Sequence, residues 1–375
     1  MKKTKLLYII TKIDKSDEFE YTLSELSKYY NLMVVLLHFQ GRTSSLENFL
    51  LSKNIFTKRI NYSHWYDAFY AFIKLLLIHL KFRPHITHAH LYEGSVLGLL
   101  TAYLCGIKHR IYTRHHSSLN HIYYPHAIKK DKLCNALSTH IIAVSDVVKK
   151  VLVQDEKVVP EKITVIDHGI NLDEFQKINP HTLSTLKLQY NPTDKKPIIG
   201  VISRYVKWKG VNYTIAAFKD VLKTYPNALL ILVGNPEGDA KEEVTTALHT
   251  LPKESYIQIS FEKNIKELFL LFDVFVHTPV DNHSEAFGLV YLEAMCSKVP
   301  IVTTHSGIAN TLLIHQKNAL ICTYKNSQSI THNILQVLSN NHLKEQLIQN
   351  AWNDVQSFSF DKKISILIEL YNSCK

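Results

Sequence analysis

The stretch Ser284-Glu285-Ala286-Phe287-Gly288-Leu289-Val290-Tyr291-Leu292-Glu293-Ala294-Met295 connects a loop to a predicted helix. The apolar run 274–277 before it is typical of a buried strand. Gly288 lies where the helix is expected to begin, and the free N–H groups of a helix N-terminus can bind a phosphate. Glu285 and Glu293 are eight residues apart, so their carboxylates can reach different ends of one elongated ligand. The stretch therefore predicts a strand–loop–helix unit that binds a phosphorylated ligand carrying hydroxyl groups.

Short apolar runs alternate with longer helical patterns on both sides of this stretch, which predicts parallel sheets covered by helices on both faces. The pattern pauses at 178–197, a segment with three prolines and a polar cluster, which we interpret as a connection between two domains. We therefore expect an α/β chain of two Rossmann-like doubly wound domains, at 1–185 and 190–357, with a C-terminal helix at about 358–375 that packs back on the first. The predicted strands are 6–10, 32–38, 86–88, 110–113, 141–144, 163–166, 198–202, 228–233, 256–260, 274–277 and 301–303.

The composition is that of an ordinary globular enzyme, with 46% hydrophobic and 20% charged residues. The formal net charge of +10 allows contact with something acidic, but the excess lysines are scattered along the chain, which favours a solvated basic surface. The five cysteines are widely spaced and form no Cys-x-x-Cys, so we expect neither disulfides nor a zinc site. No stretch reaches the roughly 20 apolar residues that span a bilayer, and no signal peptide is visible, so we expect a cytoplasmic protein.

A second loop, 200–210, leaves the predicted strand 198–202 and ends at a helix. Arg204 and Lys209 are five residues apart on it, and two cations at a strand end can converge on one diphosphate. Gly210 opens the next helix. The alternative for this loop alone is a pair of solvated surface cations.

Taken in order, these motifs resemble those of a family-four retaining glycosyltransferase of the GT-B fold, also described as glycosyl transferases group 1. The resemblance rests on the Glu-x7-Glu spacing of Glu285 and Glu293 and on Arg204 and Lys209 in their strand–loop context. It also rests on Val233-Gly234 at a strand end and on the run 168–175, which begins His-Gly-Ile-Asn. The match runs over most of the chain and is strongest from 163 to 309.

The resemblance implies a metal-independent enzyme that moves a sugar from a UDP- or GDP-sugar to a hydroxyl acceptor in cell-surface glycan or lipopolysaccharide biosynthesis. The first domain would bind the acceptor, a glycan or a lipid-linked glycan, and the second the donor. Arg204 and Lys209 would hold the diphosphate, Glu285 would face the donor sugar and Glu293 would bind the ribose. The implied catalytic residues are Glu285, His115, Arg204 and Lys209, and the implied donor-binding residues are Arg204, Lys209, Gly234, Phe287, Gly288, Leu289 and Glu293.

In the N-terminal half, the run Ile86-Thr87-His88-Ala89-His90 resembles the family's His-x-His, and Thr113-Arg114-His115 resembles its Thr-x-His. His115 would then lie beside the reacting sugar, with the adjacent His116 as an open alternative. Two positions depart from the family pattern. The first strand is followed by a loop without glycine at 11–16, and Asn310 stands where the family has a carboxylate.

The segment 65–83 is apolar, aromatic and basic, which fits either a buried helix of a doubly wound domain or a helix at the inner face of a membrane. Two other functions stay open. The N-terminal histidines could bind the metal of a hydrolase, and the basic charge could serve a non-catalytic binder of phosphorylated ligands. We expect no nucleic-acid partner, because none of the motifs of nucleic-acid-binding modules is present.

Overall fold

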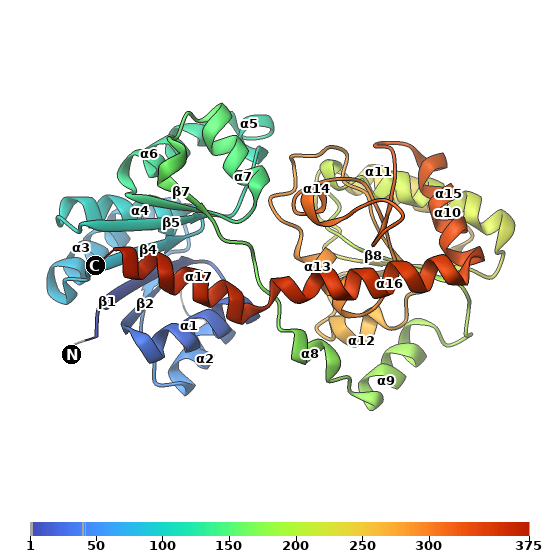
Figure 1. Cartoon of the computed structure of the whole chain (residues 1–375), viewed down its shortest axis with the longest axis horizontal. Helices are drawn as coiled ribbons and strands as arrows, with labels where there is room; N and C mark the ends of the chain where they lie inside the picture. Colours follow the sequence, from blue (N-terminus) through green and yellow to red (C-terminus); the bar gives the residue numbers. More distant parts are fainter. Residues whose placement is uncertain (1–2, 40, 42, 375) are drawn as a thin grey trace. The chain divides into compact units, whose positions relative to one another are not determined.

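The computed structural model describes residues 3–39, 41 and 43–374. It consists of two compact units, 1–169 with 360–375 and 170–359. Each unit is built around one parallel sheet with helices on both faces (Figure 1). The expectation of two Rossmann-like α/β domains is therefore confirmed.

The sheet of unit 1 has the strand order β3-β2-β1-β4-β5-β6-β7, and every pair of neighbouring strands in it is parallel. Helices α1, α2 and α17 form one packed group, and α3, α4 and α6 form another. The strands are β1 (Lys5–Thr11), β2 (Asn31–His38), β3 (Phe56–Asn61), β4 (Ile86–His90), β5 (His109–Arg114), β6 (His140–Ala143) and β7 (Ile163–Val165). The helices are α1 (Asp17–Tyr29), α2 (Ser45–Ser52), α3 (Ala68–Phe82), α4 (Tyr92–Leu104), α5 (Leu119–Ile122), α6 (Ile128–Leu137), α7 (Asp146–Lys150) and α17 (Phe360–Ser373).

Local sequence explains the main elements of this unit. Ser16 caps α1, since its side chain accepts a hydrogen bond from the N–H of Phe19. The strands β1 and β2 are buried on both faces, as expected for continuous apolar runs in a parallel sheet. The C-terminal helix α17 places Leu367 and Tyr371 in the same core as β1 and β4.

The sheet of unit 2 has the order β10-β9-β8-β11-β12-β13, again with parallel neighbours. The strands are β8 (Ile198–Ile202), β9 (Leu229–Val233), β10 (Tyr256–Ile259), β11 (Val274–His277), β12 (Ile301–Thr303) and β13 (Leu320–Ile321). The helices are α8 (Leu172–Gln176), α9 (Pro180–Tyr190), α10 (Val211–Thr224), α11 (Lys241–Leu248), α12 (Ile265–Phe269), α13 (Leu289–Cys296), α14 (Ala309–Leu312), α15 (Ser327–Ser339) and α16 (Asn341–Val355).

The chain passes from unit 1 to unit 2 at Gly169–Ile170, ahead of the connection expected at 178–197. The reason is that α8 and α9 pack on helices of unit 2. The hydroxyl of Tyr190 donates a hydrogen bond to Glu262 at 2.8 Å, and the N–H of Asn179 donates one to Glu267 at 3.1 Å. These contacts attach a proline-containing, polar segment to the second sheet.

Candidate active site

The loops that follow the strand ends of unit 2 bring one residue of each of the two sequence motifs together. Lys209 follows β8, and Glu285 lies in the loop between β11 and α13. Their side chains form an ion pair in which both are largely buried, with 11% and 13% of the side chain exposed. The ammonium group of Lys209 also lies 4.5 Å from the ring centroid of Trp208. The cation is therefore held on a stem packed against an aromatic ring, with one carboxylate as its partner.

His277, the last residue of β11, completes this cluster. Its Nε2 lies 3.4 Å from Oε2 of Glu285. Burial, together with the charge of Lys209, lowers the pKa of His277 to about 4. Burial by itself would raise the pKa of Glu285, but the charge of Lys209 and the hydrogen bond with His277 outweigh it and lower that pKa to about 2. At neutral pH the cluster thus holds an ionised Glu285, paired with Lys209, beside a neutral imidazole.

Two glycines allow the loops around this cluster to approach one another. A Cβ on Gly234, which has φ +149°, would lie 2.1 Å from the carbonyl oxygen of Ser203 and 3.1 Å from the nitrogen of Arg204. A Cβ on Gly307 would lie 2.9 Å from Cγ of Glu285. Glycine is therefore required where the end of β9 touches the Arg204 loop and where the loop after β12 touches Glu285.

The remaining predicted residues of this half lie on the same loops. Phe287 is buried and its carbonyl accepts a hydrogen bond from the N–H of Ile308 at 2.8 Å. Gly288 directly precedes α13, Leu289 begins it, and Glu293 lies half-buried on its second turn. Arg204 is exposed on the loop after β8.

Asn310, the departure from the family pattern, has a structural role in this unit. Its side-chain amide donates to the carbonyl oxygens of Asn282, at 2.8 Å, and Gly307, at 3.1 Å. A carboxylate could not donate these hydrogen bonds. Asn310 thus connects the loop that precedes Glu285 to the loop that contains Gly307.

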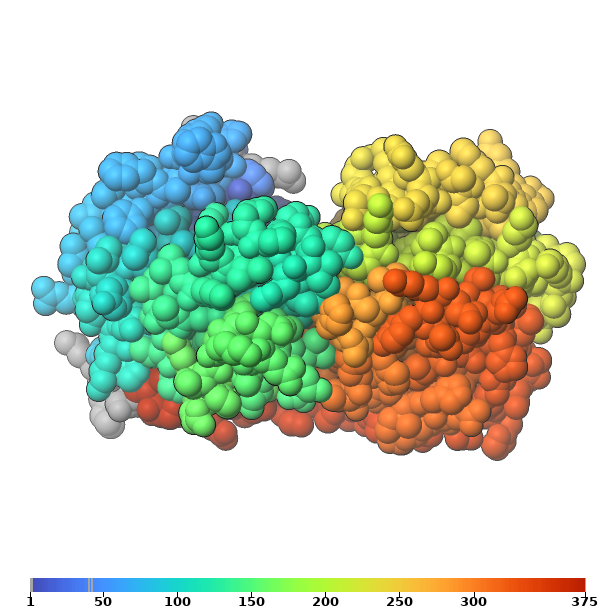
Figure 2. Space-filling model, turned by 90° about the horizontal axis from the view of Figure 1, so that it is seen from above, coloured from blue at the N-terminus to red at the C-terminus, as the bar shows by residue number. Residues whose placement is uncertain are grey.

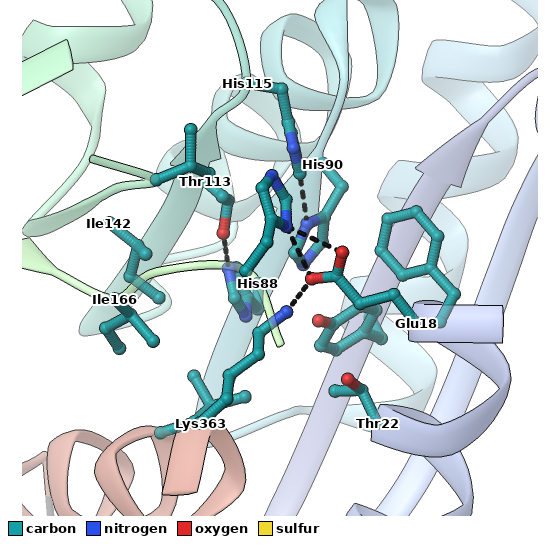
Figure 3. A pocket seen from close by; sticks show the side chains of 14 residues that line it. Glu18, Thr22, His88, His90, Thr113, His115, Ile142, Ile166 and Lys363 are labelled. Atoms are coloured by element: carbon teal, nitrogen blue, oxygen red, sulfur yellow. Dashed lines mark hydrogen bonds and ion pairs between the residues drawn. The ribbon is translucent and has the colours of Figure 1, made fainter. Parts of the chain in front are cut away.

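In unit 1, the histidines at the ends of β4 and β5 line a small pocket of ≈ 20 Å³ (Figure 3). His90 Nδ1 and His115 Nε2 are 3.2 Å apart, and the ring of His168 stacks on His115 with centroids 5.6 Å apart. His88 contacts Thr113 at 2.8 Å and the hydroxyl of Tyr371 at 2.5 Å. Burial and the neighbouring imidazoles hold the pKa of His115 and of His90 well below the ordinary value, so both rings are neutral at pH 7.

His115 and His116 lie in different surroundings. His116 lies outside the pocket, with its Nε2 3.2 Å from the carboxylate of Asp131, which also pairs with the buried Arg114. His115 is the one that faces His90 and His168. His116 therefore belongs to a buried ion-pair cluster and His115 to the pocket.

The pocket also contains charged groups that the sequence did not single out. Glu18, from the first turn of α1, contacts His168 Nδ1 at 2.7 Å and pairs with Lys363 of α17 (Figure 3). Sequence reasoning missed Glu18 and Lys363 because they are more than 300 residues apart and neither lies in a motif. It also gave no role to His277, although its position at the end of a predicted strand was a usable signal.

The histidines of unit 1 do not assemble a metal site. Within the described part of the chain, no group of three or more His, Cys, Asp or Glu side chains could hold a metal ion. His88 in particular has both ring nitrogens engaged by Thr113 and Tyr371. The hydrolase alternative therefore lacks a ligand set among these residues.

Comparison with known proteins matches both halves of the chain. The family model described as Glycosyl transferases group 1 matches residues 185–354, and the model described as Glycosyltransferase Family 4 matches residues 33–174. The capsular polysaccharide biosynthesis glycosyltransferase CapM of Staphylococcus aureus is 24% identical over 312 residues, which cover 81% of this chain and 80% of CapM. The alpha-monoglucosyldiacylglycerol synthase of Acholeplasma laidlawii is 24% identical over 291 residues, 72% of this chain and 71% of that enzyme.

Among solved structures, that of Anabaena HepE in complex with UDP-glucose superposes with a TM-score of 0.82 at 20% identity, covering 98% of this chain and 100% of HepE. This likeness supports the fold assignment. The two family models extend over most of both units, and their residue ranges include the motifs described above. The chain therefore belongs to the group 1 glycosyltransferases, which have the GT-B fold.

Proposed function

We propose that this glycosyltransferase moves a hexose from a nucleotide-diphosphate sugar to a hydroxyl acceptor, with retention at the anomeric carbon, in the biosynthesis of a bacterial surface polysaccharide or lipopolysaccharide. Retention and the family of donors follow from the motif resemblance. The surface-glycan role draws on CapM, which is named for capsular polysaccharide biosynthesis. We further propose UDP as the donor's nucleotide, because the HepE structure contains UDP-glucose.

The observation that carries this proposal is the buried Lys209–Glu285 pair beside the N-terminus of α13. A diphosphate bound there would contact the ammonium group of Lys209, which would then be shared between the diphosphate and Glu285. This cation would stabilise the negative charge that develops on the leaving phosphate. The backbone N–H groups at Gly288 and Leu289, which follow Phe287, would contribute further donors. Gly234 would allow the backbone to approach the diphosphate, and Arg204 would provide the second cation.

The two carboxylates then have separate roles. Glu285, held next to Lys209, would accept hydrogen bonds from hydroxyl groups of the donor sugar, and Glu293 would accept them from the ribose. In unit 1 we propose His115 as a catalytic residue, because its neutral ring can accept or donate a proton. The leaving phosphate would take the acceptor's proton in a same-face mechanism, since no carboxylate stands out as a covalent nucleophile. Charge stabilisation by Lys209 and Arg204 would make a divalent metal unnecessary.

The first test is a thermal-shift screen with UDP, GDP, ADP and their sugar conjugates, because a ligand that binds only the folded state raises its apparent stability. We expect UDP and a UDP-sugar to raise the midpoint of unfolding. Lys209→Ala should abolish this shift. Lys207→Ala is the matched control, because Lys207 lies on the same loop and is 57% exposed. Equal shifts for the two variants would rule out the proposed diphosphate site.

The second test is catalytic. Glu285→Gln and Lys209→Ala should each lower turnover by roughly 100-fold, the scale observed when one preorganised electrostatic contact is removed. A chelator should leave the rate unchanged, and the anomeric configuration of the product, determined by NMR, should match that of the donor. Loss of activity with chelator, or an inverted product, would contradict the corresponding part of the proposal.

A further inference from the structure

Helix α3 of unit 1 is apolar on its outer side as well as on its inner side. Ala71, Leu75 and Ile78 are buried in the unit, as a doubly wound fold requires. The outer side carries large apolar side chains spaced by four, three, four and three residues, which is the spacing of one continuous helical stripe. These exposed residues are Tyr66, Tyr70, Ile73, Leu77 and Leu80.

Two further aromatic residues extend the stripe at the N-terminal end of α3. Trp65 is 83% exposed and Phe69 is 76% exposed. The turn that carries Trp65 is well defined, since the carboxylate of Asp67 accepts hydrogen bonds from the N–H groups of Ser63 and His64 at 2.7 and 2.9 Å. The aromatic side chains are therefore presented to solvent by an ordered turn and helix.

A groove of ≈ 930 Å³ runs between α3 and the edge strand β3. Figure 2 shows the blue and light-blue segment that contains β3 and α3 at the surface of unit 1. The groove is lined by apolar side chains of both elements and by three lysines, Lys58, Lys74 and Lys81. Lys58 and Lys74 lie over the rings of Phe56 and Tyr70, at 5.8 and 5.2 Å. Their apolar stems thus cover aromatic surface while their charged ends reach solvent.

The acidic groups near this face are already engaged. Glu47 is buried and lies 3.6 Å from Arg59, and the carboxylate of Asp67 accepts the two backbone hydrogen bonds described above. Arg59 neutralises Glu47, and the three groove lysines exceed the single charge of Asp67, so the face carries a net positive charge next to its aromatic and aliphatic surface.

We propose that the outer face of α3, with the groove along β3, docks on an anionic lipid bilayer. An apolar patch of this extent marks an interaction surface. Aromatic residues flanked by cations are the composition that places a helix at the level of lipid headgroups. The contact is peripheral, since no helix built from the described residues is long and apolar enough to cross a membrane.

A second copy of the chain fits this face less well than a membrane. A two-fold symmetric contact would pair the face with itself. The three lysines of one copy would then face the three of the other and outnumber the Asp67 carboxylates. An anionic surface instead provides complementary charge to all three lysines at once, together with an apolar interior for Trp65 and Phe69.

Vesicle flotation of the full chain tests the proposal, with vesicles of phosphatidylcholine alone and of phosphatidylcholine mixed with phosphatidylglycerol. We expect binding to the mixed vesicles that weakens as salt is added. Each lysine near an anionic surface strengthens binding by roughly fivefold, the equivalent of about 1 kcal/mol. The triple variant Lys58→Gln, Lys74→Gln, Lys81→Gln should therefore bind roughly a hundredfold more weakly. Trp65→Ser with Phe69→Ser should lower binding at least tenfold, because both side chains would enter the interface.

Matched controls separate this face from general charge and hydrophobicity. Lys219→Gln with Lys253→Gln removes exposed cations of unit 2, and Leu188→Ser with Phe261→Ser removes exposed apolar side chains there. Both pairs should bind vesicles as the parent chain does. The thermal midpoint and the UDP-induced shift should be unchanged in the α3 variants, so a failure of the membrane proposal is distinguishable from a failure of the donor site.

Three outcomes would overturn the proposal. One is the absence of binding to anionic vesicles, and another is binding that the α3 variants leave intact. The third is self-association that depends on protein concentration and is abolished by Trp65→Ser with Phe69→Ser, in a chain that does not bind vesicles. That result would assign the face to a second copy of the chain. Selective loss of anionic-vesicle binding in the α3 variants supports it.

Discussion

The substitution Glu285→Gln replaces one charge of the buried Lys209–Glu285 pair with a neutral group of nearly the same shape. In the folded chain, the effect of Lys209 and His277 exceeds that of burial and holds the pKa of Glu285 at about 2. The carboxylate of an unfolded glutamate titrates near 4.3. The ionised form is therefore favoured by folding, and its loss should destabilise unit 2.

The magnitude follows from this difference in pKa. A lowering of roughly two units, at about 1.4 kcal/mol per unit, corresponds to about 3 kcal/mol in the free energy of unfolding. Because the folded pKa is the lower one, this contribution is present above the unfolded pKa and is lost as the pH falls from about 4.5 toward 2. Between pH 7 and 5, the stability difference between the parent and Glu285→Gln should thus stay constant.

The assay is urea unfolding followed by circular dichroism at pH 7 and at pH 5. The matched control is Glu237→Gln, because Glu237 also pairs with a lysine, Lys241, at 2.7 Å, but with 68% and 51% of the two side chains exposed. Exposed ion pairs contribute at most about 1 kcal/mol. The control should therefore unfold almost as the parent does.

The predicted contribution of the pair is refuted if Glu285→Gln costs no more than Glu237→Gln at pH 7, since the buried pair would then add no more to the free energy of unfolding than an exposed pair. It is also refuted if the cost differs markedly between pH 5 and pH 7. The second result would mean that the pKa of Glu285 in the folded chain is raised above its ordinary value instead of lowered, and hence that Lys209 does not hold it ionised.

Three further predictions follow from the same structure. Gly234→Ala should lower the free energy of unfolding by about 1–3 kcal/mol and weaken UDP binding by displacing the Arg204 loop. The control Gly106→Ala, at a position with positive φ but nothing within 4 Å of the added Cβ, should leave UDP binding unchanged. Equal UDP affinities of the two variants, measured by calorimetry, would contradict this prediction. Asn310→Asp should lower the free energy of unfolding, measured by urea unfolding, by about 1–3 kcal/mol, because two hydrogen bonds are lost. An unchanged free energy of unfolding would show that these hydrogen bonds do not hold the two loops together. Burial lowers the pKa of His79 to about 4 and of His88 to about 3. Below pH 6.5 these histidines therefore bind more protons in the unfolded chain than in the folded chain, so the stability should fall as the pH drops. A thermal midpoint that is as high at pH 5 as at pH 7 would disprove this prediction.

Most of the fold was predictable because apolar periodicity is a local property. The run 274–277 and the strand–helix alternation around it correspond to β11 and its neighbours. The edge strand β3 was missed, because Lys58 and Arg59 interrupt its apolar pattern and its outer edge needs no partner. The two-residue strand β13 was too short to give a pattern.

The site was predictable to the extent that its residues lie within one loop or helix. The sequence by itself determined that Glu285, Gly288 and Glu293 belong to one loop–helix unit, and that Arg204 and Lys209 leave one strand end, because neighbours in sequence are necessarily neighbours in space. Only the tertiary structure decided that Lys209 pairs with Glu285 beside His277, that His115 rather than His116 lines the pocket, and that Glu18 meets Lys363. Apart from His277 and Glu285, which are eight residues apart, these contacts join segments tens to hundreds of residues apart, and their distances depend on strand order and helix packing, which no local pattern encodes.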